Sequence, residues 1–254
     1  MNIKDVATLL NDKIQTVRGE QSSTILVGPI KLPVNLEGET VVFQWYCWLP
    51  VRDEEDRQNL LNANAETIVK RLSTLNLAEG QQSSVLVYGD LQQSENALVR
   101  MHSICHTGDI FGSKRCDCGF QLHQSMKMIV EHGTGALFYL ANHEGRGIGL
   151  FSKAMAYILQ EEGMDTVEAN HQLGFEDDTR NYADAISVLQ HLRQKPVTLI
   201  TNNPKKLDAL KKSGMNVAGR MPLWGDVSQY NERYLNTKVE RSGHLRDSDL
   251  REVL

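Results

Sequence analysis

From residue 120 onward, the apolar positions switch regularly between the spacing of helices and that of strands. Apolar residues three and four apart predict three helices: 121–131, 150–162 and 181–194. Short apolar runs predict two strands: 136–141 and 197–201. A fourth helix is framed by Asn203 as its cap, Pro204 at its first position and Gly214 beyond its end. This alternation predicts an α/β core in which helices cover a sheet.

The first part of the chain follows a different pattern. Its apolar residues predict a packing helix over 2–18, a β-rich stretch over 23–50, and a helix over 53–77 with acidic residues in its first turn. After the loop-like segment LAEGQQSS, the run 83–91 predicts a strand that ends in a Gly-Asp turn. The one candidate domain boundary therefore falls near Gly80.

Three of the four cysteines lie in the stretch RMHSICHTGDIFGSKRCDCG, with the spacing Cys105-x10-Cys116-x-Cys118. Two thiols that flank one residue, joined by a third from a loop, can hold one metal ion. Three protein ligands leave a position for water, which is typical of catalytic zinc sites. His102 or His106 as a fourth ligand would instead make the site structural, and free or buried thiols are the alternative to any metal.

Composition and charge narrow the classes of function. The chain has 254 residues, 41% hydrophobic and 23% charged, which is ordinary for a globular protein. A net charge of −5 argues against a general nucleic-acid binder but permits a local basic pocket for a phosphorylated ligand. No apolar run approaches the length of a membrane span, and the N-terminus, MNIKDVATLL, has no secretory pattern. We therefore expect a cytoplasmic protein that contacts neither membrane nor nucleic acid.

The cysteine content does not suggest a disulfide framework, because four cysteines are few for a chain of this length. Clustered cysteines in a reducing compartment are more often metal ligands or catalytic residues. Cys47 stands apart from the cluster, among aromatic residues of the β-rich stretch. We expect it to be a buried small hydrophobic residue and not a ligand.

Three further motifs could bind a ligand, although each also has a plain structural explanation. HEGRGIG, at 143–149, would bring backbone close to an anion at a helix start, or form a tight turn with solvated charges. TNNPKK, at 201–206, places lysines beyond the carboxyl end of a strand, where open α/β sheets bind ligands; solvated surface lysines are the alternative. GFEDDTRNY, at 174–182, sets carboxylates beside an arginine, which could position a phosphate or simply cap a helix.

Four motifs stand in order along the chain: RxHSxCxTGDxFGSxRCDCGxQL, HEGRGIGL, TVEANxxLGFxxDxRxY and LITNNPKK. With them the chain closely resembles the GTP cyclohydrolase II family, which opens riboflavin biosynthesis. The resemblance implies a three-layer α/β/α mixed sheet of the GTP cyclohydrolase II type, with a β-rich and helical N-terminal extension. It divides the chain into that extension, 1–82, a catalytic domain, 83–243, and a C-terminal tail, 244–254.

The resemblance also implies the site. Its zinc-ligand positions hold Cys105, Cys116 and Cys118, with one zinc per chain, and Mg²⁺ accompanies the triphosphate. Its GTP-contacting positions hold Arg100, Met101, His102, Ser103, Ile104, Gln121, Glu144, Gly145, Arg146, Thr166, Thr201 and Lys206. Its catalytic positions hold Asp178 as proton acceptor, Arg180 as nucleophile toward the α-phosphorus and Tyr157 near the chemistry at C8. Because an ordinary arginine stays protonated, we favour an electrostatic role for Arg180.

The reaction implied by the resemblance is the zinc-dependent hydrolysis of GTP at C8 by a homodimer. It releases formate and pyrophosphate and yields 2,5-diamino-6-ribosylamino-4(3H)-pyrimidinone 5′-phosphate. A metal-activated water would supply the nucleophile, although three thiolates make that water less acidic than three histidines would. Mg²⁺, Arg146 and Lys206 would offset the charge of the leaving pyrophosphate.

Two positions depart from the family pattern and keep two alternatives open. Ile104 stands where the family usually carries glutamate, and His106 replaces a commonly apolar residue. A paralogue that acts on another purine or pyrimidine compound, or that stops at the formamide, would fit these changes. A non-catalytic nucleotide-binding protein with structural zinc is the second alternative. The pair Asp178 and Arg180 disfavours it, because binding alone has no evident need for both.

Overall fold

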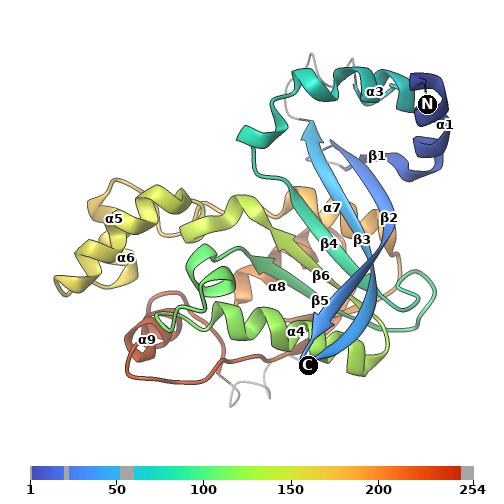
Figure 1. The fold of residues 1–254 in the computed structure, drawn as a ribbon. Coiled ribbons are helices and arrows are strands. Elements are labelled where there is room, and N and C mark those ends of the chain that lie inside the picture. Colours follow the sequence, from blue (N-terminus) through green and yellow to red (C-terminus); the bar gives the residue numbers. More distant parts are fainter. Residues whose placement is uncertain (1, 20–22, 52–59, 247–254) are drawn as a thin grey trace.

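Eight strands of the described residues form one mixed sheet, which runs through the molecule in Figure 1. The computed structural model describes residues 2–19, 23–51 and 60–246. The strands are β1 Ile14–Arg18, β2 Ser23–Leu36, β3 Glu39–Val51, β4 Ser83–Tyr88, β5 Ala97–Ser103, β6 Gly135–Leu140, β7 Val197–Ile200 and β8 Val217–Met221. Their spatial order is β1-β2-β3-β4-β6-β5-β7-β8.

The pairing changes from antiparallel to parallel at β6. Strands β1 to β4 pair antiparallel with their neighbours, and so does β4 with β6. Beyond β6, the strands β5, β7 and β8 are all parallel to it. Parallel strands end at the same edge of a sheet, so β5, β6 and β7 deliver their following loops to one place. Ligands bind at this edge in open α/β sheets.

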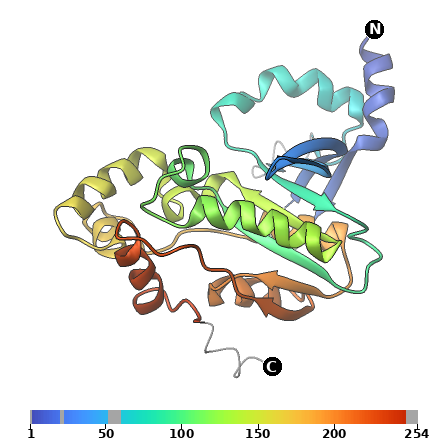
Figure 2. The ribbon, with the colours of Figure 1, turned by 60° about the horizontal axis from the view of Figure 1, so that its bottom comes forward.

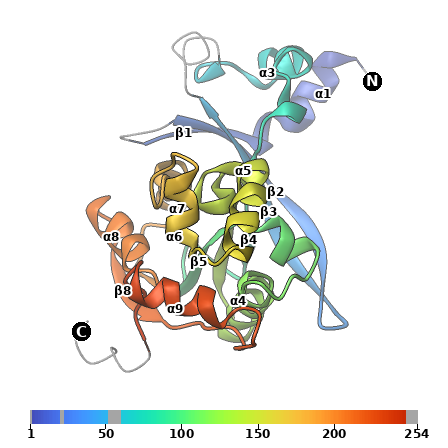
Figure 3. The same ribbon diagram turned by 90° about the vertical axis from the view of Figure 1, so that its left-hand side faces the viewer.

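Helices cover both faces of the sheet, which confirms the predicted α/β/α layers (Figure 3). The described helices are α1 Ile3–Leu10, α3 Ala65–Arg71, α4 Cys118–His132, α5 Gly149–Glu161, α6 Thr166–Gln172, α7 Ala183–Leu192, α8 Pro204–Lys212 and α9 Glu232–Glu240. On one face, Ile129 of α4 packs in a cluster with Leu137 of β6. On the other, Leu189 of α7 and Leu210 of α8 share a cluster with Val99 of β5.

The prediction of a helix over 2–18 is wrong for residues 11–18. Helix α1 ends at Leu10, and polar residues Asn11–Lys13 form a 3₁₀ turn. Residues 14–18 form the edge strand β1, which pairs with β2. There Val17 becomes 3% exposed and the backbone gains ladder hydrogen bonds. Long-range pairing of this kind overrides a short stretch of helical spacing.

The helix predicted over 53–77 is shorter in the structure. Helix α3 begins after Asn64, whose side chain caps it, and the acidic residues expected in its first turn, 53–56, lie outside the described residues. Helices α1 and α3 lie at the open end of the β2–β3 hairpin, away from α5 and α6 (Figure 2). There Leu60 packs with Ile25 and forms a small separate core.

The other predicted strands and helices are present with small shifts at their ends, whereas β5, β8, α6 and α9 were not predicted. Strand β5 buries the polar residues Arg100 and His102, so its composition does not indicate a core strand. Strand β3 pairs with β4 across the predicted boundary at 82, and the division into domains stays a prediction. Within the described ranges, every helix is too short or too polar to cross a bilayer.

Candidate active site

Three adjoining cavities lie where the loops after β5, β6 and β7 meet. We call them the thiol cavity, the cation cavity and the outer cavity, with volumes of about 110, 80 and 130 Å³. The thiol cavity is lined by Cys105 and its cysteine neighbours, the cation cavity by Lys206, and the outer cavity by Asp178 and Lys205. Arg180 lines all three, so the cavities form parts of one site.

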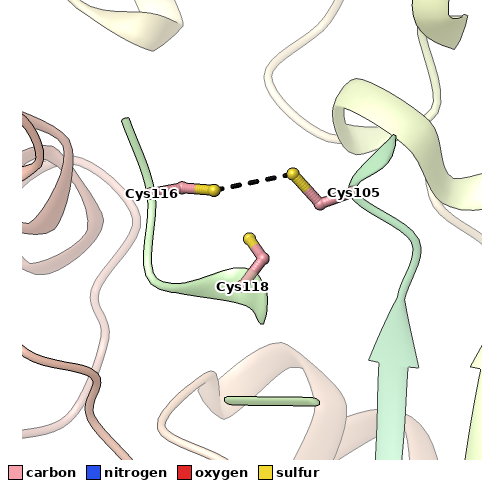
Figure 4. Close-up of side chains that lie close together, drawn as sticks. All are labelled: Cys105, Cys116 and Cys118. Carbon is pink, nitrogen blue, oxygen red and sulfur yellow. Dashed lines mark hydrogen bonds between the residues drawn. The ribbon is translucent and has the colours of Figure 1, made fainter. Parts of the chain in front are cut away.

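Figure 4 shows the thiols of Cys105, Cys116 and Cys118 facing one another. Cys105 follows β5, and Cys118 is the first residue of α4. The three sulfur atoms lie within 4.8 Å of one another, and those of Cys105 and Cys116 are 3.6 Å apart. Gly108 packs against them, since a Cβ there would lie 2.9 Å from Cys116 Sγ. Neither His102 nor His106 belongs to this group, which has the three-ligand composition of an open metal site.

The thiols divide unequally between charged and neutral forms. Hydrogen bonds from Cys116 and Cys118, with the nearby Lys153 ammonium, hold the pKa of Cys105 far below its usual range. The pKa of Cys116 is raised to about 11, chiefly by its hydrogen bond to Cys105 and by burial, and that of Cys118 is also raised. A metal that binds all three as thiolates must therefore displace protons, which makes binding weaker at low pH.

Lys153 of α5 is the cation closest to the thiols. Its Nζ lies 3.1 Å from Cys105 Sγ and donates to Glu144 Oε1 at 2.6 Å. Burial opposes its charge, but the charges of Cys105 and Glu144 raise the pKa of Lys153 above its ordinary value. Glu144, 2% exposed, also accepts from the backbone N–H of His106 at 2.6 Å. One carboxylate thus fixes both the cation and the loop after Cys105.

Asp109 holds that loop from the other side. Its carboxylate accepts from the backbone N–H of Cys105 at 2.9 Å and from the Tyr139 hydroxyl at 3.1 Å. His102 Nε2 lies 3.1 Å from the same oxygen, and its ring stacks on Tyr139. The side chains of His102 and Asp109 are each 2% exposed. Since a buried carboxylate must be hydrogen-bonded, these partners fix the position of Cys105.

Asp117, between two of the cysteines, ties the thiols to the C-terminal part of the chain. Its side chain is fully buried and accepts from Lys238 Nζ of α9 at 2.6 Å. It also accepts from Gln121 Nε2 at 2.7 Å and from the backbone N–H of Gly225. Burial opposes its charge, but Lys238 lowers the pKa of Asp117 below its usual value. The ionised carboxylate therefore holds α9 against the thiol loop.

The loop after β6 turns sharply beside the thiols. Gly145, Arg146 and Gly147 all have positive φ, of 60°, 69° and 99°. A Cβ at Gly147 would lie 2.2 Å from Thr179 Oγ1, so only glycine fits there. Left-handed backbone is uncommon for an arginine and is held here by its neighbours. It places Arg146 on both the thiol and the outer cavity.

The cation cavity gathers positive charge, of which the Arg180–Asp178 and Lys238–Asp117 ion pairs balance a part. Arg100, Arg180, Lys206 and Lys238 all line it. Lys206 is 6% exposed and donates to the Met101 carbonyl at 2.7 Å. Burial, then the charges of Arg100 and Arg180, hold the pKa of Lys206 well below its ordinary value. An anion in this cavity would relieve that unfavourable environment.

Arg180 and Asp178 form a two-pronged ion pair. Arg180 Nε donates to one oxygen of Asp178 and its terminal nitrogen to the other, both at 2.7 Å. Burial opposes the carboxylate charge, but Arg180 lowers the pKa of Asp178 to about 2. Burial opposes the charge of Arg180, but Tyr182 and the hydrogen bond to Asp178 raise the pKa of Arg180 above its ordinary value. A second terminal nitrogen of Arg180 donates to Ser103 Oγ. Arg180 is therefore protonated and fixed in direction.

The sequence-predicted site residues come together, with one exception. The thiol cavity is lined by Ser103, Ile104, Cys105, Cys116, Cys118, Glu144, Gly145, Arg146, Tyr157, Thr166 and Arg180. The cation cavity adds Arg100, His102, Gln121, Thr201 and Lys206, and the outer cavity adds Asp178. The exception is Met101, whose side chain is fully buried in the core and whose carbonyl alone meets Lys206. The roles assigned to these residues stay predictions.

Sequence reasoning missed Lys153, Asp109, Asp117 and Tyr234, all of which contribute to the site. Asp109 and Asp117 stand inside the TGD and CDC motifs, so their closeness to the cysteines was an available signal. Lys153 and Tyr234 give no such signal, because they reach the site from distant helices. Cys47 is half-buried, away from the thiol group, and its Sγ lies 3.5 Å from the Ser83 carbonyl.

Comparison with known proteins gives the family. The model of the GTP cyclohydrolase II family matches residues 71–222. The chain belongs to the GTP cyclohydrolase II family. Over 166 residues it is 51% identical to GTP cyclohydrolase-2 of Colwellia psychrerythraea, and the match covers 65% of this chain and 82% of that protein. The resemblance inferred from the motifs is confirmed, and with it the prediction of a hydrolase of the GTP cyclohydrolase II type.

Longer members of the GTP cyclohydrolase II family match over the same share of the chain. Riboflavin biosynthesis protein RibBA of Bacillus velezensis is 48% identical over 171 residues, which cover 67% of this chain and 43% of that protein. Monofunctional riboflavin biosynthesis protein RIBA 3, chloroplastic, of Arabidopsis thaliana is 46% identical over 171 residues, which cover 34% of its length. The chain thus spans less than half of these longer relatives.

His143 predicts a pH dependence of stability. It is 2% exposed, and burial followed by the charges of Arg180 and Lys206 lowers its pKa to about 4. The unfolded chain takes up a proton near pH 6.5 and the folded one does not. Stability is therefore lost as pH falls below about 6.5, by about 2 kcal/mol at about pH 5. Denaturant unfolding of His143→Gln should show a shallower loss between about pH 7 and 5.

The exposed His132, at the end of α4, provides the control. His132→Gln should keep the pH dependence of the unmodified protein. An unchanged dependence in His143→Gln would contradict the assignment to His143.

Proposed function

We propose that this chain hydrolyses GTP at C8, with release of formate and pyrophosphate, to 2,5-diamino-6-ribosylamino-4(3H)-pyrimidinone 5′-phosphate. The proposal rests on membership of the family and on one observation. A three-thiol group and a cation-lined cavity belong to one site and share Arg180. A nucleotide would match both parts of this site, because its base would lie beside the thiol group and its phosphates beside the cations.

We propose zinc as the metal held by Cys105, Cys116 and Cys118. Thiolates are ligands that zinc favours, and the group faces a cavity, which suits a catalytic site with an open position. When bound, zinc would activate water for attack on the purine ring. The Lys153 ammonium beside Cys105 offsets part of the thiolate charge. This positive charge would partly counteract the effect of three thiolates, which make a metal-bound water less acidic.

The base would lie in the thiol cavity. Tyr157 lines it beside the metal ligands, and its hydroxyl lies 3.2 Å from Thr107 Oγ1, which is itself 3.7 Å from Cys105 Sγ. Arg115 lies over the Tyr157 ring, 4.4 Å from its centre, and fixes its orientation. Thr166 lines the same cavity and would offer its hydroxyl to the base. These contacts support the assignments carried over from the family.

The phosphates would lie toward the cation and outer cavities. Arg146 and Lys206 would offset their charge together with Mg²⁺. Arg180 would act as a fixed, protonated donor to the α-phosphate, because its ion pair with Asp178 opposes the deprotonation that a nucleophile needs. The homodimer implied by the family and the cytoplasmic location expected from the sequence belong to the same proposal.

One observation favours a second candidate, a paralogue with a different substrate or an incomplete reaction. Ile104 lines the thiol cavity next to Cys105, while its backbone N–H donates to the Leu140 carbonyl at 3.1 Å. An apolar residue therefore lines the cavity proposed for the base, at a position where the family usually has a carboxylate. A polar group of the substrate that loses its partner costs on the order of 1–3 kcal/mol.

The metal assignment predicts a difference between two cysteine variants. The purified protein should contain about one zinc per chain, and Cys116→Ser should lose it, because two remaining thiols bind zinc far more weakly. Cys47→Ser should keep its zinc, since Cys47 lies outside the thiol group. Elemental analysis after dialysis measures both. A Cys47→Ser protein without metal would show that the ligand set is wrong.

The reaction and the role of Arg180 are tested together. Incubation with GTP, Zn²⁺ and Mg²⁺, followed by mass spectrometry, should give formate, pyrophosphate and the pyrimidine phosphate. Arg180→Ala should lower pyrophosphate release by roughly a hundredfold or more, the effect of removing a donor to developing charge. Its zinc content should be unchanged, because Arg180 contacts Asp178 and Ser103 and not the thiols. Pyrophosphate release at the normal rate would remove Arg180 from the mechanism.

Ile104→Glu decides between the two candidates. If the apolar side chain limits the reaction, the variant should turn over GTP about tenfold faster or carry it further toward deformylated product. If Ile104 only packs beneath the loop, a buried glutamate should lower zinc content and melting temperature. Turnover, zinc and melting are measured on the same preparation. Complete and efficient conversion of GTP by the unmodified protein would exclude the paralogue.

A further inference from the structure

Helix α9 forms a wall of the site, although it lies beyond residues 71–222 that match the family model. Tyr234 of this helix lines the thiol, cation and outer cavities, and Arg180 is the one other described residue that does so. The site therefore has a junction between its metal end and its cationic end, lined by Arg180 and Tyr234.

The helix is fastened to the site by several contacts. The Lys238–Asp117 ion pair, with side chains 10% and 0% exposed, ties α9 to the residue between two of the cysteines. After the helix, His244 Nδ1–H donates to the Lys238 carbonyl at 3.0 Å, and the Leu245 N–H donates to the Asn202 carbonyl at 2.8 Å. Breaking a buried ion pair is costly, so α9 belongs to the folded site.

Tyr234 is held with its hydroxyl free to meet a ligand. Lys238 Nζ lies 4.4 Å from the centre of its ring, which fixes the ring by a cation–π contact. Among the described residues, the polar neighbour of its hydroxyl is Cys118 Sγ, at 3.9 Å. That distance is long for a hydrogen bond, and sulfur is a weak acceptor. A phosphate or ribose oxygen at the junction would be a better acceptor.

We propose that Tyr234 is a substrate-contacting residue that donates a hydrogen bond to the ribose–α-phosphate part of the nucleotide. This inference rests on the proposed function, since a nucleotide that spans the thiol and cation cavities would pass Arg180 and Tyr234, which line both. Lys238 is paired with Asp117 and therefore positions α9, whereas the Tyr234 hydroxyl contacts the substrate.

The test compares Tyr234→Phe with the unmodified protein by zinc content, melting temperature, calorimetric binding of guanosine 5′-monophosphate and GTP turnover. The variant keeps the ring and loses the hydroxyl. We expect unchanged zinc and melting, affinity for the monophosphate weakened about tenfold, and KM for GTP raised to a similar extent. Tyr230→Phe is the matched control, because Tyr230 is 64% exposed and lines none of the three cavities.

Three results would overturn the inference. Equal affinity of Tyr234→Phe and the unmodified protein for the monophosphate would remove the hydrogen bond. Loss of zinc or a large fall in melting temperature in Tyr234→Phe would make the hydroxyl structural. If the unmodified protein neither binds the monophosphate nor turns over GTP, the proposed function fails, and the inference falls with it.

Discussion

Two buried carboxylates, Asp109 and Asp117, fix the chain segments that carry the three thiols, so that the thiols lie close together. Thiols that lie within 4.8 Å resist carrying charge together, so their closeness must be imposed by the surrounding chain. Asp109 fixes the backbone at Cys105, and Asp117 fixes the start of α4. Each brings negative charge of its own into a negative region. The site therefore depends on two lysines, Lys153 and Lys238, that reach it from helices distant in sequence.

The charges of the site are separated along its length. The three thiols and Glu144 line the thiol cavity. The cation cavity is lined by Arg100, Arg180, Lys206 and Lys238, of which Arg180 and Lys238 are paired with carboxylates. Burial, and after it the charges of Arg100 and Arg180, lower the pKa of Lys206, so an anion among these cations would stabilise its charged form. A ligand that carries its charge at one end only would fit in a single direction. Orientation is thus set by electrostatics before any individual contact is made.

The sequence could predict those features that depend on neighbouring residues. The cap at Asn203, the ends of α4 and α5 and the thiol spacing are local, and the structure has them. Features that depend on partners far along the chain were missed or wrong. Residues 14–18 form a strand because β2 pairs with them. Strand β5 was not recognised in the sequence because it buries two polar residues, Arg100 and His102. Lys153 and Tyr234 look like ordinary helix residues until the fold brings them to the cysteines.

The pairing of β3 with β4 has a consequence for the chain as a whole. Without β1 to β3, the strand β4 would form the border of the sheet and expose unpaired backbone groups, a template on which another chain could align. The N-terminal hairpin occupies that border, and the border moves out to the short strand β1. The strands β1 to β3 thus cover the edge of β4, and side chains such as Leu26 of β2 and Trp48 of β3 join them to the main core.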